Sequence, residues 1–98
     1  MAIKATKWDV SEYLETEEDI AAYLNAVMEE GDLALLQAAI GDIAKARGMT
    51  SIAREAGVGR ESLYKSLSAN GNPSFQTIAK VADALGLQVS FQPATVNS

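Results

Sequence analysis

Two short helical patterns meet at Gly57 within residues 52–67, which read IAREAGVGRESLYKSL. Two helices that cross closely need a small residue in the first helix, a glycine at the turn, and an apolar residue in the second helix that points back into the core. Ala53, Gly57 and Leu63 stand at these three places. The pattern predicts a helix-turn-helix, and the alternative is a pair of packed helices in an all-α core that binds no DNA.

Three further segments have the period of a helix. Residues 16–31 place apolar side chains at positions i, i+3, i+4, i+7 and i+8, and Thr16 can cap their first free backbone N–H groups. Asp32 and Ser74 can cap the other two segments in the same way, and we expect Thr50 to cap the first helix of the pair. The predicted helices are 17–30, 33–47, 51–56, 60–68 and 75–85. Within residues 33–85 one helix precedes the pair and one follows it, which is the order found in repressor-type domains.

The helical spacing also predicts which side chains are buried. Each helix should turn one apolar stripe toward a common core. The expected core positions are Ile20, Tyr23, Leu24, Val27, Met28, Leu36, Ala39, Ile40, Ile43, Ala44, Ile52, Ala53, Ala56, Val58, Leu63, Leu67, Phe75, Ile78, Ala82 and Leu85.

The segment LQVSFQP, residues 87–93, alternates apolar and polar side chains and predicts a half-buried strand that ends at Pro93. A single strand leaves its backbone groups without partners, so we expect it to pair with a second copy of the chain or with the sheet edge of another protein. The apolar side chains Leu87, Val89 and Phe91 are the predicted dimerisation residues.

Charge divides the chain of 98 residues into two parts. Residues 1–32 hold nine acidic and two basic residues, a net charge of -7, whereas residues 33–98 hold four acidic and six basic residues, a net charge of +2. We therefore expect an acidic N-terminal arm and helix over 1–32 and a mildly basic domain over 33–98, which carries the helix pair and the C-terminal strand.

The composition argues against several classes of function. The chain has no cysteine and no histidine, so thiolate and imidazole metal ligands, disulfides and the usual nucleophile–base pairs are missing. We expect neither an enzyme nor a metal or other cofactor. No apolar run reaches the roughly 20 residues of a membrane-spanning helix, and no secretory signal is recognisable, so no membrane contact is expected and the cytoplasm is the expected location.

If the helix pair reads DNA, the helix that starts at Arg60 enters the major groove. The residues expected at base edges are Arg60, Glu61, Ser62 and Lys65. The residues expected near phosphates are Thr50, Ser51, Arg54, Tyr64, Asn70 and Asn72, and for Tyr64 a packing role is favoured over a phosphate contact. The net charge of residues 33–98 is only +2, so one copy should bind DNA weakly. We therefore expect two copies to bind together, with their reading helices roughly 34 Å apart.

Four stretches carry a resemblance to a known family: WDVSEYL, EDIAAYLNAVMEEGD, IAKARGMTSIAREAGVGRESLYKSLSANGNPSF and VADALGL. They resemble the addiction-module antidote proteins, the HigA-like, Xre-type antitoxins of bacterial toxin–antitoxin operons. The resemblance covers nearly the whole chain and implies an all-α, repressor-like fold of the lambda repressor type with about five helices, an acidic helical arm and a short C-terminal strand. It also implies a dimer that binds its own operator. Gly59 departs from the family, which often has serine as the cap of the reading helix.

The same resemblance implies a partner, a small basic ribonuclease toxin of the RelE and ParE superfamily. An acidic arm with an apolar stripe suits the basic surface of such a toxin. The predicted toxin contacts are Trp8, Tyr13, Ile20, Tyr23, Leu24 and Val27. The alternative for residues 17–30 is a helix that packs on the body with its charges in solvent, and the alternative for the whole protein is a stand-alone Xre-type transcription regulator without a toxin.

Overall fold

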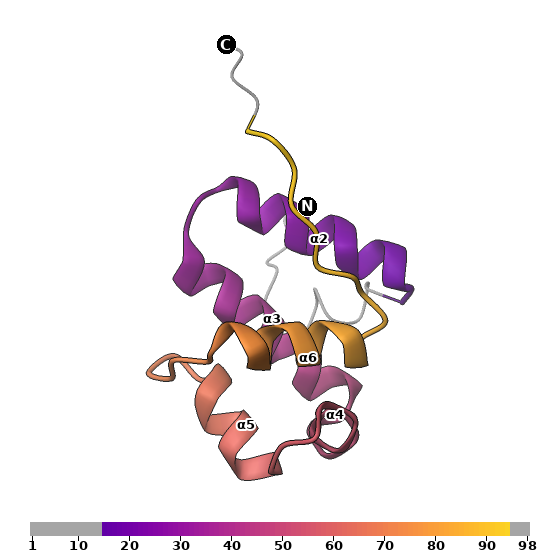
Figure 1. Cartoon of the computed structure of the whole chain (residues 1–98), viewed down its shortest axis with the longest axis vertical. Coiled ribbons are helices and arrows are strands. Elements are labelled where there is room, and N and C mark those ends of the chain that lie inside the picture. The colour runs from indigo at the N-terminus through magenta and orange to yellow at the C-terminus, as the bar shows by residue number, and fades with distance from the viewer. Residues whose placement is uncertain (1–14, 95–98) are drawn as a thin grey trace, which may run out of the picture.

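The computed structural model describes residues 15–94, which form five helices and no strand. The helices are α2 (Glu17–Glu29), α3 (Leu33–Arg47), α4 (Met49–Ala56), α5 (Arg60–Leu67) and α6 (Phe75–Ala84). Helices α3 and α6 cross the middle of the molecule, α2 lies on one side of them, and the short helices α4 and α5 lie on the other (Figure 1). The prediction of an all-α chain with five helices is confirmed for this range.

Three of the five helices begin at the side-chain caps that the sequence predicts. Thr16 and Asp19 form a reciprocal capping box, in which the Asp19 N–H donates to Thr16 Oγ1 at 3.0 Å and the Thr16 N–H donates to Asp19 Oδ2 at 3.3 Å. Asp32 Oδ1 accepts from the Leu35 N–H at 3.1 Å, and Ser74 Oγ accepts from the Thr77 N–H at 3.0 Å. These contacts fix where α2, α3 and α6 start.

The start of α4 differs from the prediction that Thr50 caps it. The helix already begins at Met49, and its N-cap is Gly48, which has no side chain to contribute. Gly48 has a φ of 107°, and it ends α3 through an N–H bond to the Lys45 carbonyl while its own carbonyl accepts from the Ile52 N–H. Because one residue serves both helices, α4 starts before Thr50 reaches the cap position.

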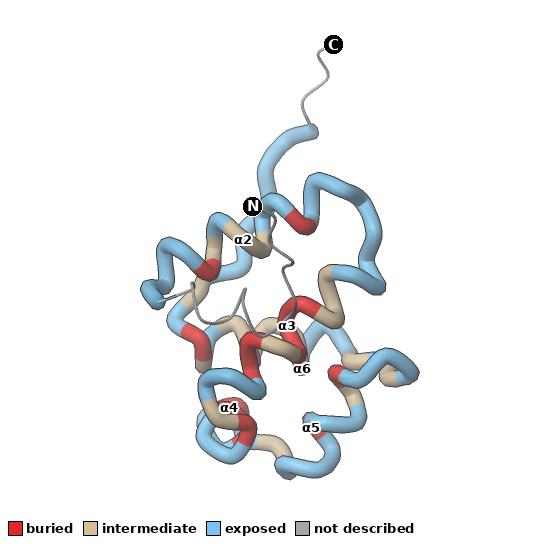
Figure 2. The backbone as a smooth tube through the Cα atoms, turned by 180° about the vertical axis from the view of Figure 1, so that it is seen from behind, coloured by how far each residue is buried: buried red, intermediate tan, exposed pale blue. Residues whose placement is uncertain are grey.

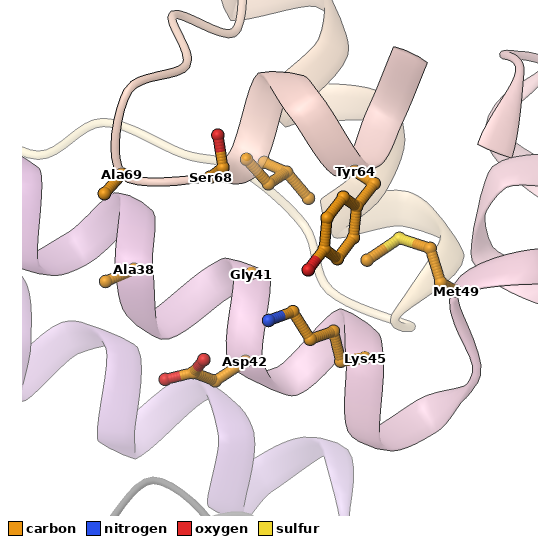
Figure 3. Close-up of a pocket in the computed structure, with 9 residues that line it drawn as sticks. Ala38, Gly41, Asp42, Lys45, Met49, Tyr64, Ser68 and Ala69 are labelled. Carbon is orange, nitrogen blue, oxygen red and sulfur yellow. The ribbon is translucent and has the colours of Figure 1, made fainter. Parts of the chain in front are cut away.

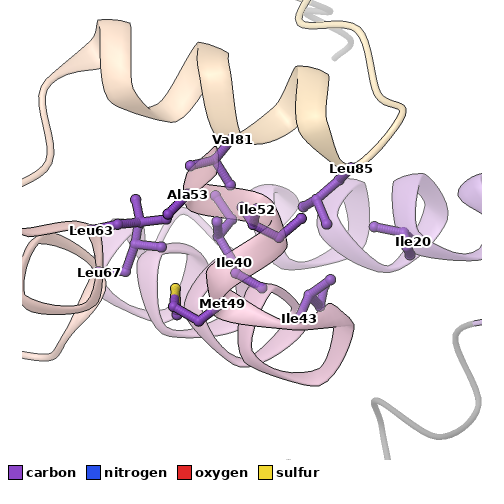
Figure 4. Packing of buried hydrophobic residues seen from close by; sticks show 11 residues of the cluster. Ile20, Ile40, Ile43, Met49, Ile52, Ala53, Leu63, Leu67, Val81 and Leu85 are labelled. Carbon is purple, nitrogen blue, oxygen red and sulfur yellow. The ribbon is translucent and has the colours of Figure 1, made fainter. Parts of the chain in front are cut away.

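One hydrophobic core receives side chains from all five helices (Figure 4). It contains Ile20, Ile40, Ile43, Ala44, Met49, Ile52, Ala53, Leu63, Leu67, Val81 and Leu85. Ile20 is completely buried, and α2 packs along α3. The back view shows buried positions in α2 as well as in α3, α4 and α5 (Figure 2). The acidic helix is therefore part of the folded body.

Two expected core residues are instead exposed. Val81 and Leu85 of α6 are buried and Ile78 is half-buried, but Phe75 on the same stripe is 63 % exposed. Burial thus falls toward the N-terminal end of α6, which extends beyond the core. Met28 on the α2 stripe is 52 % exposed, although its neighbour Val27 is buried.

The predicted strand over residues 87–93 is not present as a strand. Leu87 packs partly against the core, whereas Val89 and Phe91 are exposed, the latter by 85 %. A strand exists only when a neighbouring backbone satisfies its N–H and C=O groups, and residues 15–94 contain no other strand to pair with. In the single chain the segment is therefore irregular.

Candidate nucleic-acid interface

The connection between α4 and α5 is a tight turn centred on Gly57. Gly57 adopts the left-handed conformation, with φ 76° and ψ 29°, and its N–H donates to the Arg54 carbonyl at 3.2 Å. The next residue, Val58, donates its N–H to the carbonyl of Ala53 at 3.0 Å. These two bonds close α4 as a glycine stop, so the chain reverses within three residues and α5 crosses α4 at a fixed place.

Helix α5 has one buried and one exposed face. Leu63 and Leu67, four residues apart, are 1 % and 4 % exposed and anchor the helix to the core. The residues predicted to contact base edges, Arg60, Glu61, Ser62 and Lys65, are all exposed. Helix α5 lies at the edge of the molecule (Figure 1). Its polar side chains are thus open to a large partner, and contact with DNA stays a prediction.

Tyr64 connects this exposed face with α3. The Lys45 Nζ atom lies 5.1 Å from the centre of the Tyr64 ring, within the range of a cation–π contact. The ring remains 50 % exposed, and Figure 3 shows it beside Lys45 and Met49. Tyr64 thus lies against Lys45 of α3, while its favoured packing role and a phosphate contact through its hydroxyl both stay predictions.

The close-up in Figure 3 also shows a small cavity of about 150 Å³ between α3 and α5. Its lining residues are Ala38, Gly41, Asp42, Lys45, Met49, Tyr64, Leu67, Ser68 and Ala69. Pockets for small organic ligands usually enclose roughly 300–1,000 Å³. The cavity is too small for such a ligand.

The loop after α5 is held by a residue that the sequence analysis did not single out. Gln37 on α3 donates from Nε2 to the Ser68 carbonyl at 2.7 Å and to the Gly71 carbonyl at 3.2 Å, and the Ser66 carbonyl lies 3.4 Å away. The Ser68 carbonyl also accepts from the Gly71 N–H at 2.8 Å, so the amide adds a second donor there and ties the loop to α3. The turn residues Asn70 and Gly71 predicted a loop, but only the fold shows that Gln37, about thirty positions earlier, fixes it.

Gly71 lies against the last turn of α5. A Cβ atom at this position would collide with the backbone carbonyl oxygens of Lys65 and Ser66. Only glycine allows this approach. The predicted phosphate-contacting residues on either side, Asn70 and Asn72, are exposed beside α5. Thr50, Ser51 and Arg54 are exposed on α4, so each candidate phosphate contact lies on a solvent-facing surface.

The residues predicted to contact a toxin have varied environments. Trp8 and Tyr13 lie outside the described residues. Ile20 and Val27 are buried, and Tyr23 and Leu24 are partly buried against the core. These four side chains of α2 therefore face the protein's own body and its acidic residues face solvent, while contact with a toxin stays a prediction.

Within residues 15–94 no group of histidine, cysteine, aspartate or glutamate residues is arranged to hold a metal ion. No helix in that range is both long enough and apolar enough to cross a lipid bilayer.

The chain belongs to the family described as probable addiction module antidote protein, whose model matches residues 4–93. It is also similar to an uncharacterized protein of Haemophilus influenzae strain Rd, with 52 % identity over 85 residues, which is 87 % of this chain and 88 % of that protein. No solved structure matches the chain. Family membership over nearly the whole sequence agrees with the resemblance on which the expectation of an antitoxin rests.

Proposed function

We propose that this protein is the antitoxin of a toxin–antitoxin pair. It binds and neutralises a small basic ribonuclease of the RelE and ParE superfamily, and as a homodimer it represses its own operon by binding operator DNA. The observation that carries the proposal is membership of the antidote family over residues 4–93. The exposed polar face of α5 supports the DNA-binding part.

On the DNA side, α4, the turn at Gly57 and α5 form a helix-turn-helix, and α5 enters the major groove. Arg60 or Lys65 donates to a guanine, while Ser51 and Arg54 on α4 bind phosphates. Asn70 and Asn72 reach the neighbouring phosphates from the loop that Gln37 holds. The exposure of all these side chains supports this arrangement.

Two copies bind the operator together. The domain over 33–98 has a net charge of only +2, which limits the affinity that one copy gains from phosphate contacts. The segment 87–93 becomes a strand when it pairs with the same segment of a second copy, and this pairing covers Leu87, Val89 and Phe91. The exposure of Val89 and Phe91 in the single chain supports this role.

On the toxin side, the acidic N-terminal region covers the basic surface with which the toxin grips RNA. Residues 15–32 contain seven acidic residues and no basic one, and all seven acidic residues are exposed. Electrostatic repulsion between these carboxylates and the DNA phosphates also keeps this side of the protein away from DNA. The toxin therefore occupies the face opposite α4 and α5.

Growth rescue tests the proposal. The small open reading frame adjacent to this gene is expressed from an inducible promoter, alone and together with this protein. We expect growth arrest by the neighbour, rescue by this protein, and a complex of the two that co-purifies. If the neighbour is not toxic, or if arrest persists with both proteins present, the antitoxin proposal fails and a stand-alone Xre-type regulator takes its place.

A further inference from the structure

An open hollow lies on the exposed side of α5. The residues that line it are Arg60, Glu61, Tyr64 and Lys65. Its volume is about 540 Å³, and all four residues are exposed. They stand at positions i, i+1, i+4 and i+5, which span an arc of roughly 140° on a helix with 3.6 residues per turn. The hollow is therefore a feature of one face of α5.

All the residues that line this hollow belong to a single helix. A small ligand needs walls on several sides, since pockets for such ligands bury roughly 70–90 % of the ligand's surface. One helix does not provide such walls, so the occupant has to surround the helix instead. The major groove of DNA, about 12 Å wide, does so, because an α-helix with its side chains is roughly 10–12 Å across.

The four side chains differ in what they can recognise on a base pair. Arg60 and Lys65 donate hydrogen bonds, as the acceptors of a guanine require, and the Glu61 carboxylate accepts, as the amino group of a cytosine requires. The ring of Tyr64 is apolar. The apolar group that a base pair presents in the major groove is the 5-methyl group of thymine.

Contacts with α3 decide which part of Tyr64 the hollow receives. Lys45 Nζ lies 5.1 Å from the centre of the ring, and Tyr64 also lines the small cavity between α3 and α5. In Figure 3 the hydroxyl end of the side chain is directed toward α3, beside Lys45 and Gly41. The side chain nevertheless stays 50 % exposed. The ring is thus oriented before any partner binds, which lowers the entropy cost of binding.

We infer that the Tyr64 ring contacts the 5-methyl group of a thymine and that Tyr64 is a specificity-determining residue for DNA. The inference rests on the proposed function, which places α5 in the major groove, and it adds the base that Tyr64 reads. Arg60 and Tyr64 are one helical turn apart, about 6 Å along the axis, and base pairs follow one another every ~3.4 Å. The thymine therefore lies within about two base pairs of the guanine that Arg60 or Lys65 binds.

Replacement of thymine by deoxyuridine tests the inference, because the two nucleotides differ only in the 5-methyl group. A duplex from the region upstream of this gene is made in both forms, and fluorescence anisotropy at fixed salt gives the affinity for each. We expect the unchanged protein to bind the deoxyuridine duplex about 10- to 20-fold more weakly. One lost methyl contact lowers the affinity by about 3- to 5-fold, and two copies bind the duplex.

Two variants of Tyr64 show whether its ring causes this difference. Tyr64→Ala should bind the two duplexes with affinities within about twofold of each other. Its helical content should not change, since Tyr64 is half exposed and lies outside the buried core cluster. Tyr64→Phe keeps the ring and should keep the difference between the duplexes. Loss of the difference in Tyr64→Phe would assign the effect to the hydroxyl and overturn the inference.

Two further variants are the controls. Phe75→Ala removes an exposed aromatic side chain from α6, and it should leave both affinities within about twofold of those of the unchanged protein. Lys65→Ala removes a donor from the same hollow, so it should weaken binding to both duplexes and keep the difference between them. If Lys65→Ala abolishes the difference as Tyr64→Ala does, the ring is not the specific partner of the methyl group.

The outcomes separate the inference from the proposal beneath it. If the unchanged protein binds both duplexes equally well, the thymine contact is wrong while the DNA-binding proposal stands. If the difference persists in Tyr64→Ala, another residue reads the methyl group and the inference is wrong as well. If the unchanged protein binds neither duplex, the DNA-binding part of the proposed function fails and the inference fails with it.

Discussion

At the scale of single residues, Gly71 shows how one missing side chain shapes the proposed DNA-binding face. The loop that holds Asn70 and Asn72 lies directly on the end of α5, and it does so because Gly71 brings its backbone against the Lys65 and Ser66 carbonyl oxygens. The Gln37 amide then ties the loop to α3. A small residue and a distant amide together place the loop beside the helix.

Gly71→Ser should destabilise the protein by about 2–3 kcal/mol, because the new side chain collides with backbone oxygens that cannot move without opening the end of α5. Thermal unfolding followed by circular dichroism should show a midpoint lower by roughly 10–20 °C. Gly59→Ser is the matched control. Gly59 caps α5 with φ -71°, and a Cβ there would come no closer than 3.7 Å to Ser62 Oγ. Serine at this cap should stabilise by a few tenths of a kcal/mol, and equal midpoints for the two variants would contradict the role of Gly71.

At the scale of elements, the helix starts show what can be read from sequence. Thr16, Asp32 and Ser74 act through bonds to backbone groups three residues away, so the sequence contains both partners and the predictions are confirmed. Thr50 was wrongly predicted as a cap because Gly48 serves two helices at once, which depends on how α3 and α4 join. Hydrogen bonds between residues close in the sequence predict where a helix starts. The prediction fails where one residue, such as Gly48, caps two successive helices.

The rest of the fold depends on distant partners. Gln37 gives no signal in the sequence because its carbonyl partners are about thirty residues away. Phe75 lies on the correct stripe of α6, yet the sequence does not show where the core ends, so its burial was wrongly predicted. The alternation in residues 87–93 predicted a strand, but a strand needs a second backbone that the single chain does not supply.

The exposed face of α5 leads to a prediction at the same scale. Arg60→Ala and Lys65→Ala should each weaken binding to a duplex from the region upstream of this gene by about 5- to 150-fold, because each removes a proposed donor to a base edge. Fluorescence anisotropy at fixed salt measures the effect. Lys80→Ala is the matched control, since it removes the same charge from the exposed side of α6. If Lys80→Ala weakens binding as much as Lys65→Ala, net charge rather than the position on α5 governs the affinity.

At the scale of the whole molecule, the segment 87–93 is expected to control the oligomeric state. The double variant V89S/F91S should be monomeric in sedimentation experiments, and it should bind the duplex with a shallower salt dependence, because one copy neutralises fewer phosphates than two. Its helical content should not change, since both side chains are exposed in the single chain.

The control for this variant changes the other side of the same segment. Q88S/Q92S keeps the alternating apolar side chains and should have the same oligomeric state as the unchanged protein. If the unchanged protein is itself monomeric at the concentrations that bind DNA, the segment is not a dimerisation strand. Pairing with the sheet of the toxin then becomes the remaining role for it.

The burial of Ile20 has a consequence for the lifetime of the protein in a cell. Ile20 of the acidic helix and Leu63 of α5 belong to one core, so we expect the two regions to unfold as a single cooperative unit. A protease that engages the unfolded chain should therefore destroy the acidic helix and the proposed DNA-binding face of α5 in one event. We expect release of the toxin and renewed transcription of the operon to start together, without a stage at which a truncated protein still occupies the operator.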